Sequence, residues 1–170
     1  MPCVIVIGGA PGCGKSTLAA ALRAELRCPW IDFGRLREFH LLPDWSDQSP
    51  QEESMAFENL VSIARNYLRH GYAHVIIDDL RHPRVLEFPA AVPDALVKII
   101  TLVLSDPVEL RRRIVARNDG FKDADAAVRW NQQIIESVAM PCETRIDVAK
   151  KSREEVLREA MSNGLSRAMC

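Results

Sequence analysis

Apolar and polar positions along the chain alternate between short β-branched runs and longer segments with helical spacing. The apolar runs are predicted strands, at residues 3–7, 29–32, 73–78, 97–104 and 144–148. Strands that alternate with helices are typical of a parallel sheet, because each parallel connection has to cross over one face of the sheet. The pattern therefore predicts an α/β domain with helices on both faces of the sheet.

Helix boundaries are marked by capping residues. The segments 49–52, 106–109 and 152–155 each place a side-chain oxygen first and a glutamate three residues later, which is typical of a helix start. Between Ser49 and Gly71 the apolar residues fall on one stripe of a long helix, and Gly71 suits its left-handed end. The stripe consists of Phe57, Leu60, Val61, Ala64, Tyr67 and Leu68.

Length and charge exclude several classes of protein. The 170 residues fit a single domain, and a formal net charge of -1 gives no overall positive field that would attract nucleic acid or a membrane. The five cysteines are scattered without metal-ligand spacing, which favours a reduced, cytoplasmic setting. The apolar N-terminal run is too short to span a bilayer and is interpreted as a buried strand.

The segment from Gly9 to Ser16 has the pattern G-x-x-x-x-G-K-S, between a predicted strand and a predicted helix. Small residues there let backbone N–H groups point at phosphate oxygens, and the helix adds the positive end of its dipole. Lys15 would reach the β- and γ-phosphates, and the Ser16 hydroxyl would coordinate Mg²⁺. The predicted nucleotide-binding residues are Gly9, Ala10, Pro11, Gly12, Cys13, Gly14, Lys15, Ser16 and Thr17.

The predicted strand at 73–78 ends in two carboxylates, Asp78 and Asp79, and resembles a Walker B element. An aspartate at the carboxyl end of a strand beside the phosphate loop can hold Mg²⁺, directly or through its water. Asp78 is therefore the second predicted magnesium residue. The alternative is that one of the two carboxylates only caps the following helix.

Signatures of other phosphate-loop proteins are absent from the sequence, namely Asn-Lys-x-Asp of GTP-dependent switches and Leu-Ser-Gly-Gly-Gln of transporter ATPases. The chain resembles the P-loop kinases, the superfamily of nucleoside-monophosphate kinases and small-molecule phosphotransferases, over nearly its whole length. This resemblance implies an AAA-type, three-layer P-loop NTPase fold of five parallel strands in the order 2-3-1-4-5. It also implies ATP at the carboxyl ends of the strands, with the loop after the fifth strand beside the adenine.

Residues 106–117 resemble the helix that leads into the lid of these kinases, and the lid is predicted at about residues 111–137. Arg113 and Arg117 are four apart and are predicted to share a helical face. The resemblance implies that these arginines close over the triphosphate and stabilise the transferring charge. A solvated basic helix face is the alternative. Asp123 is the predicted cap of the next helix.

The acceptor region is predicted at about residues 33–70, after the second strand. For a hydroxyl acceptor a nearby carboxylate would orient the hydroxyl and take its proton, and Asp32 is the candidate base. The segment 36–38 resembles the helix start that follows such an aspartate in antibiotic phosphotransferases and zeta-toxin-like kinases. The apolar run 41–45 is a candidate wall of the acceptor pocket.

A second resemblance points to a phosphate acceptor. Asp32-x-Gly34 resembles the cytidylate type of nucleoside-monophosphate kinase, and 79–81 distantly resembles the Asp-Gly-x-Pro-Arg element of that type. In this interpretation Arg37 and Arg81 would grip the phosphate of the acceptor bidentately. His82, next to Arg81, is a further candidate on this side.

Together these features predict an ATP-dependent kinase that transfers the γ-phosphoryl group to a hydroxyl of a small molecule. A nucleoside-monophosphate kinase is the alternative, and an ATP-binding switch or slow NTPase that acts through a partner is the alternative from another class. The predicted catalytic residues are Lys15, Asp32, Arg113 and Arg117. The predicted acceptor-binding residues are Asp32, Arg37, Asp79 and Arg81.

Overall fold

The computed structural model describes residues 1–38, 50–81, 83–118 and 120–165. Its five strands form one sheet in which every neighbouring pair is parallel, in the order β2-β3-β1-β4-β5. The predicted fold class and strand order are confirmed. In chain order the elements are β1 (Cys3–Gly9), α1 (Lys15–Leu26), β2 (Trp30–Asp32), α2 (Phe33–Glu38), α3 (Pro50–Arg69), β3 (His74–Asp78), α4 (Arg84–Ala91), β4 (Leu96–Val103), α5 (Pro107–Val115), α6 (Ala124–Glu136), β5 (Glu143–Asp147), α7 (Arg153–Glu159) and the π-helix η2 (Ala160–Leu165).

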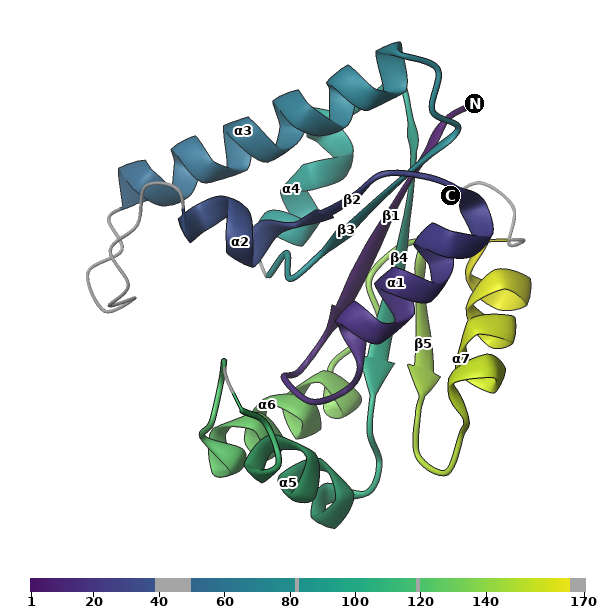
Figure 1. Ribbon diagram of the computed structural model, residues 1–170. Helices are drawn as coiled ribbons and strands as arrows, with labels where there is room; N and C mark the ends of the chain where they lie inside the picture. The colour runs from purple at the N-terminus through teal and green to yellow at the C-terminus, as the bar shows by residue number, and fades with distance from the viewer. Residues whose placement is uncertain (39–49, 82, 119, 166–170) are drawn as a thin grey trace.

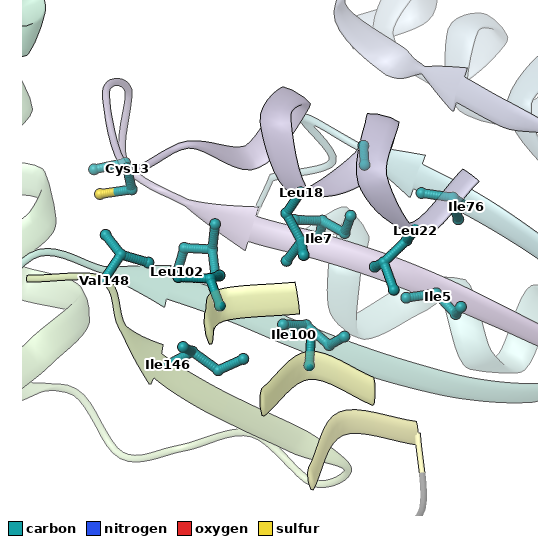
Figure 2. Close-up of a cluster of buried hydrophobic side chains, with 14 of the residues drawn as sticks. Ile5, Ile7, Cys13, Leu18, Leu22, Ile76, Ile100, Leu102, Ile146 and Val148 are labelled. Carbon is teal, nitrogen blue, oxygen red and sulfur yellow. The ribbon is translucent and has the colours of Figure 1, made fainter. Parts of the chain in front are cut away.

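Helices cover both faces of the sheet, α1 and α7 on one face and α3 and α4 on the other (Figure 1). Successive strand residues point to opposite faces. Ile5 and Ile7 of β1 therefore pack in the core under α1 (Figure 2), whereas Val4 and Val6 pack under α3. All four of these side chains are fully buried, which explains why the strand is a continuous apolar run.

Most of the predicted helix boundaries that fall on described residues are observed. The Asp106 side chain accepts hydrogen bonds from two backbone N–H groups of α5, and the Asp123 side chain accepts one from α6. Ser152 and Glu155 form a complete capping box at α7. Gly71 ends the long helix with a left-handed φ of 88°. The predicted cap Ser49 lies outside the described residues.

Two features differ from the pattern-based prediction. Helix α5 ends at Val115, so Arg117 lies past the helix and the predicted shared face with Arg113 is wrong. Helix α4, the helix expected after Asp79, had no predicted bounds, because it is short, has no side-chain cap and contains Pro89. Its two buried apolar residues hold it against the sheet.

None of the helices within the described ranges is long and apolar enough to cross a membrane. The interpretation of the N-terminal apolar run as a strand is confirmed, since it forms β1 in the centre of the sheet.

The capping box gives a stability prediction. Ser152→Ala removes the hydroxyl that accepts from the Glu155 N–H, and the free energy of unfolding should fall by about 1 kcal/mol. Ser152→Asn retains a capping oxygen and should stay close to the wild type. Urea unfolding followed by circular dichroism measures both. Equal losses in the two variants would contradict the capping role.

Candidate nucleotide and acceptor site

The predicted phosphate loop connects β1 to α1 and turns tightly against β4 and α5. Gly9 has a φ of 132°, and a Cβ atom there would lie 2.4 Å from the Leu102 carbonyl oxygen. Gly12 has a φ of 86°, and a Cβ atom would lie 2.8 Å from a Leu110 methyl carbon. Both positions therefore require glycine for conformation and for space. The loop conformation follows directly from the G-x-x-x-x-G-K-S pattern.

The remaining loop residues are arranged with the apolar ones inward and the polar ones outward. Ala10, Pro11 and Cys13 are buried, whereas Ser16 and Thr17 at the start of α1 are exposed. All nine predicted nucleotide-binding residues thus lie between the last residue of β1 and the first turn of α1. The loop leads directly into the amino end of α1, as phosphate binding requires.

Cys13 connects the loop to helix α6. Its thiol donates a hydrogen bond of 3.4 Å to Asn131 Oδ1, and burial raises the pKa of the thiol to about 11. The Asn131 side chain also bonds both the N–H and the carbonyl of Leu104 at the end of β4. Asn131 is buried, and the sequence analysis missed it, although a polar residue on the apolar stripe of α6 is a detectable signal.

The Lys15 side chain lies across its own loop. Its Nζ donates to the carbonyl oxygens of Gly9 at 2.9 Å and Ala10 at 3.4 Å, and lies 3.9 Å from Asp79 Oδ1. Burial lowers the pKa of Lys15, and the neighbouring Asp79 carboxylate opposes that shift. The Lys15 ammonium group therefore lies at the phosphate loop, beside Asp79, which is a predicted acceptor-binding residue.

Asp78, the predicted Walker B residue, accepts two hydrogen bonds. Ser16 Oγ donates to Oδ2 at 3.2 Å, and the Trp30 indole N–H donates to Oδ1 at 3.0 Å. Asp78 is only 1% exposed, and burial raises its pKa to about 6. Trp30 was missed as a site residue. Its only signal was its place on β2, which pairs with β3.

The Ser16 and Asp78 pair fits a magnesium ion, since a hydroxyl and a carboxylate are hard oxygen ligands. Within the described ranges, no group of three or more His, Cys, Asp and Glu side chains could hold a metal alone. Mg²⁺ keeps several waters and binds together with substrate phosphates, so one hydroxyl and one carboxylate are enough protein ligands for it.

On the acceptor side, Asp32 and Asp79 approach each other around Gly34. A Cβ atom on Gly34 would lie 2.9 Å from Asp79 Oδ2 and 3.1 Å from Asp32 Oδ1. Asp32 Oδ1 also accepts from the Arg35 N–H at 3.1 Å, which caps the start of α2. Glycine at position 34 thus leaves room for both carboxylates, of which Asp79 is the one beside Lys15.

The two arginines predicted for the acceptor side point to different places. Arg37 is 4% exposed, with its Nη2 3.1 Å from a Glu53 carboxylate oxygen, so it joins α2 to α3. Arg81 Nη2 lies 3.4 Å from Asp79 Oδ2, and its guanidinium lies 5.2 Å from the centre of the Trp130 ring. Only Arg81 stands next to the phosphate loop.

Of the two arginines predicted for the lid, Arg113 is held by an ion pair and Arg117 is exposed. Glu109 accepts hydrogen bonds from Arg113 at 2.9 Å and from Arg112 at 2.7 Å and 2.8 Å. These bonds lower the pKa of Glu109 to about 2. Arg117 is exposed and lies near Gly120. Figure 1 shows α5 and α6 together beyond the carboxyl ends of the strands, where a lid is expected.

Two cavities flank the phosphate loop. The larger, of about 910 Å³, lies between α1, α5 and the loop from β5 to α7, and its lining includes Gly12, Thr17, Arg113 and Lys151. The smaller, of about 390 Å³, lies on the other side, between β4 and α6. Among the described residues, Arg117 lines neither cavity. The candidate pocket wall at 41–45 and His82 lie outside the described residues.

The sheet order, the glycine-rich loop at the end of β1 and the lysine across it define a P-loop nucleotide-binding protein. The chain belongs to the AAA domain family, whose model matches residues 5–136. No curated protein matches the sequence.

Solved structures with the same fold include three that cover most of this chain. The tunicamycin resistance protein of Deinococcus radiodurans has a TM-score of 0.70 at 15% identity, over 100% of this chain and 99% of that one. A gluconokinase from Sinorhizobium meliloti has a TM-score of 0.65 at 17% identity, over 95% and 90%. Thymidylate kinase from Candida albicans has a TM-score of 0.61 at 18% identity, over 93% and 88%. At these identities the likeness establishes a fold shared with P-loop kinases.

The raised pKa of Asp78 gives a pH prediction. Because the pKa of the folded state, about 6, lies above the ordinary 3.8, Asp78 stabilises the fold below pH 4 and loses this contribution as the pH rises through 6. Asp78→Asn does not ionise. Between pH 4 and pH 8 the variant should therefore gain up to ~3 kcal/mol relative to the wild type.

Urea unfolding at several pH values, in buffer with a chelator, measures this difference. The exposed Asp94→Asn serves as the control and should show a difference from the wild type that changes little with pH. A difference between Asp78→Asn and the wild type that stays constant from pH 4 to pH 8 would rule out ionisation of Asp78 as its cause.

Proposed function

We propose that this protein is an ATP- and Mg²⁺-dependent kinase that transfers the γ-phosphoryl group to a hydroxyl of a small molecule. The observation that carries the proposal is the position of two carboxylates, Asp32 and Asp79, on either side of Gly34, with Asp79 lying 3.9 Å from Lys15 of the phosphate loop. A protein that only bound or slowly hydrolysed a nucleotide would not need those carboxylates at the place where an acceptor approaches. The likeness to a gluconokinase and a thymidylate kinase supports a kinase.

The larger cavity is the proposed ATP site. The triphosphate lies on the backbone N–H groups of the loop and the amino end of α1, and the base lies beside the loop from β5 to α7. Ser16 and Asp78 are the residues that would hold Mg²⁺. When bound, this ion neutralises charge on the β- and γ-phosphates. Arg113 lines the same cavity and reaches the phosphates when it leaves Glu109.

In the proposed reaction the acceptor oxygen attacks the γ-phosphorus, and the bond from that phosphorus to the bridging oxygen breaks, so that ADP leaves. Asp32 orients the hydroxyl and takes its proton. Lys15 and Arg113 stabilise the charge on the transferring group. Arg117 would join them only if the lid closes far enough to bring its exposed side chain to the phosphates.

A hydroxyl suits this acceptor side better than a phosphate. Arg37, one of the two arginines expected to grip a phosphate, is buried in its ion pair with Glu53. Arg81 is paired with Asp79. Two carboxylates beside the transfer point would repel a dianionic acceptor, whereas a carboxylate attracts the proton of a hydroxyl. This contrast favours the hydroxyl acceptor over the nucleoside monophosphate.

Lys15→Ala should reduce acceptor-stimulated ADP release by about 1,000-fold or more, because it removes a cation aimed at the transferring charge. A coupled ADP assay over nucleosides, nucleotides, sugars and aminoglycoside-like compounds measures the rate. Unchanged turnover in Lys15→Ala would refute the assignment of the loop. If no acceptor raises ADP release above the rate with ATP alone, the slow NTPase or switch replaces the kinase.

Asp32→Asn and Asp79→Asn form a matched pair of variants for the base. Asp32→Asn should lower kcat by about 10²- to 10⁴-fold and leave ATP binding unchanged, because the amide retains the cap of α2 but cannot take a proton. Asp79→Asn should affect acceptor KM more than kcat. The reverse result, with the loss of kcat in Asp79→Asn alone, would assign the base to Asp79.

A further inference from the structure

The cavity of about 390 Å³ between β4 and α6 has charged residues at both ends and mainly apolar walls between them. Lys15 and Asp79 line it at the phosphate loop, beside the proposed transfer point. From there it runs along β4 toward the beginning of β5, as the pairing of Ile99 with Glu143 and of Thr101 with Arg145 shows. A molecule in this cavity would thus have one end at the phosphate loop and its body under α6.

The charged residues at the far end are already satisfied by the protein. Arg145 donates to the carbonyl oxygens of Ile134, Ser137 and Val138, which close the carboxyl end of α6. The remaining N–H groups of Arg145 face the Ser137 hydroxyl and Glu143, whose side chain is 1% exposed. A guanidinium has five N–H donors, and these partners use them. Arg145 and Glu143 therefore close the cavity and offer little to a ligand.

The walls between the two ends are mainly apolar. Their apolar residues are Leu80, Val85, Ile99, Trp130, Ile134 and Met140, and Gln133 and Thr101 add polar side chains. The Arg81 guanidinium lies over the Trp130 ring, and its Nη2 pairs with Asp79. This part of the wall is therefore an aromatic ring in contact with a cation. Aromatic and aliphatic walls of this kind suit a ring better than a chain of hydroxyl groups.

One polar group in these walls lacks a partner. Thr101 lines the cavity, is 4% exposed, and its Oγ1 has no hydrogen-bond partner among the described residues. The hydroxyl lies behind Gly8, 3.3 Å from where a Cβ atom of that residue would be. A buried hydroxyl without a partner is costly, and a rotation about χ1 would let it meet a polar group of a ligand.

We infer that this cavity holds the body of the acceptor, and that the acceptor is a ring-bearing alcohol with a largely apolar body rather than a sugar or sugar acid. This inference rests on the proposed function, because it places the reacting hydroxyl at Lys15 and Asp79. A polyol of sugar type would bury several hydroxyl groups against mainly apolar walls, in which Thr101 and Gln133 are the polar side chains not used by Arg145. An aromatic or alicyclic ring with one further polar group matches these walls better.

Binding of 4-hydroxyphenylethanol, 2-phenylethanol and gluconate tests this inference by saturation-transfer NMR, without turnover. The full-length protein should bind 4-hydroxyphenylethanol about tenfold more tightly than gluconate, since only the first matches apolar walls. Thr101→Val should weaken the binding of 4-hydroxyphenylethanol about fivefold, because it removes one hydrogen bond, and should leave the binding of 2-phenylethanol unchanged. Thr101→Ser retains the hydroxyl and should behave as the wild type.

Ile134→Trp and Ile135→Trp are matched filling variants on adjacent positions of α6. Ile134 lines the cavity, whereas Ile135 is exposed and does not. Ile134→Trp should weaken the binding of 4-hydroxyphenylethanol about tenfold, because the larger side chain fills the cavity. Ile135→Trp should change this affinity less than about twofold. Circular dichroism and thermal melting check that both variants fold.

Tighter binding of gluconate than of 4-hydroxyphenylethanol would overturn the inference, and so would equal binding of 4-hydroxyphenylethanol by Ile134→Trp and the wild type. Failure of all three probes to bind would also overturn it. Binding of 4-hydroxyphenylethanol that is lost in Ile134→Trp supports the pocket even if the ADP assay finds no phosphoryl transfer. In that case the proposed kinase fails and the ligand pocket stands.

Discussion

The parallel pairing of β2 and β1 with β3 places the functional residues of the site together at the carboxyl ends of these strands. In this register Asp32 lies opposite Asp78, and Asp78 lies opposite Ile7, two residues before the phosphate loop begins at Gly9. A slip of one residue in either pair would turn a carboxylate to the other face of the sheet. The alternating apolar residues of the three strands prevent such a slip, because each set has its own core to fill.

That arrangement concentrates charge where water is largely excluded. Burial raises the pKa of Asp78 and lowers the pKa of Lys15, so each charged form is disfavoured by its surroundings. Hydrogen bonds from Ser16 and Trp30 and to the loop carbonyls compensate only in part. A bound triphosphate would supply an anion for Lys15, and its Mg²⁺ would supply a cation for Asp78. An empty site that lowers the stability of the fold is therefore suited to a nucleotide.

The sequence predicted the sheet, the phosphate loop and several helix starts, because those features depend on residues close together in the chain. Ser16 and Asp78 were assigned to one site through motifs, but other contacts between distant segments were not predicted. Trp30 reaches Asp78 across 48 positions, and Cys13 reaches Asn131 across 118. Arg37 looked available for a phosphate, yet packing of α2 on α3 pairs it with Glu53. Apolar spacing also cannot show where a charged helix such as α5 stops.

The two helices of the predicted lid, α5 and α6, differ in how firmly hydrogen bonds and ion pairs hold them. Helix α6, which forms the wall of the smaller cavity, is fixed by the buried hydrogen bonds of Asn131 to Leu104 and Cys13. Arg113 on α5 is held mainly by Glu109, and ion pairs with such exposure contribute little and exchange readily. Under the proposed function, closure over a nucleotide would move the arginines of α5, whereas the wall under α6 would keep its shape for the proposed acceptor.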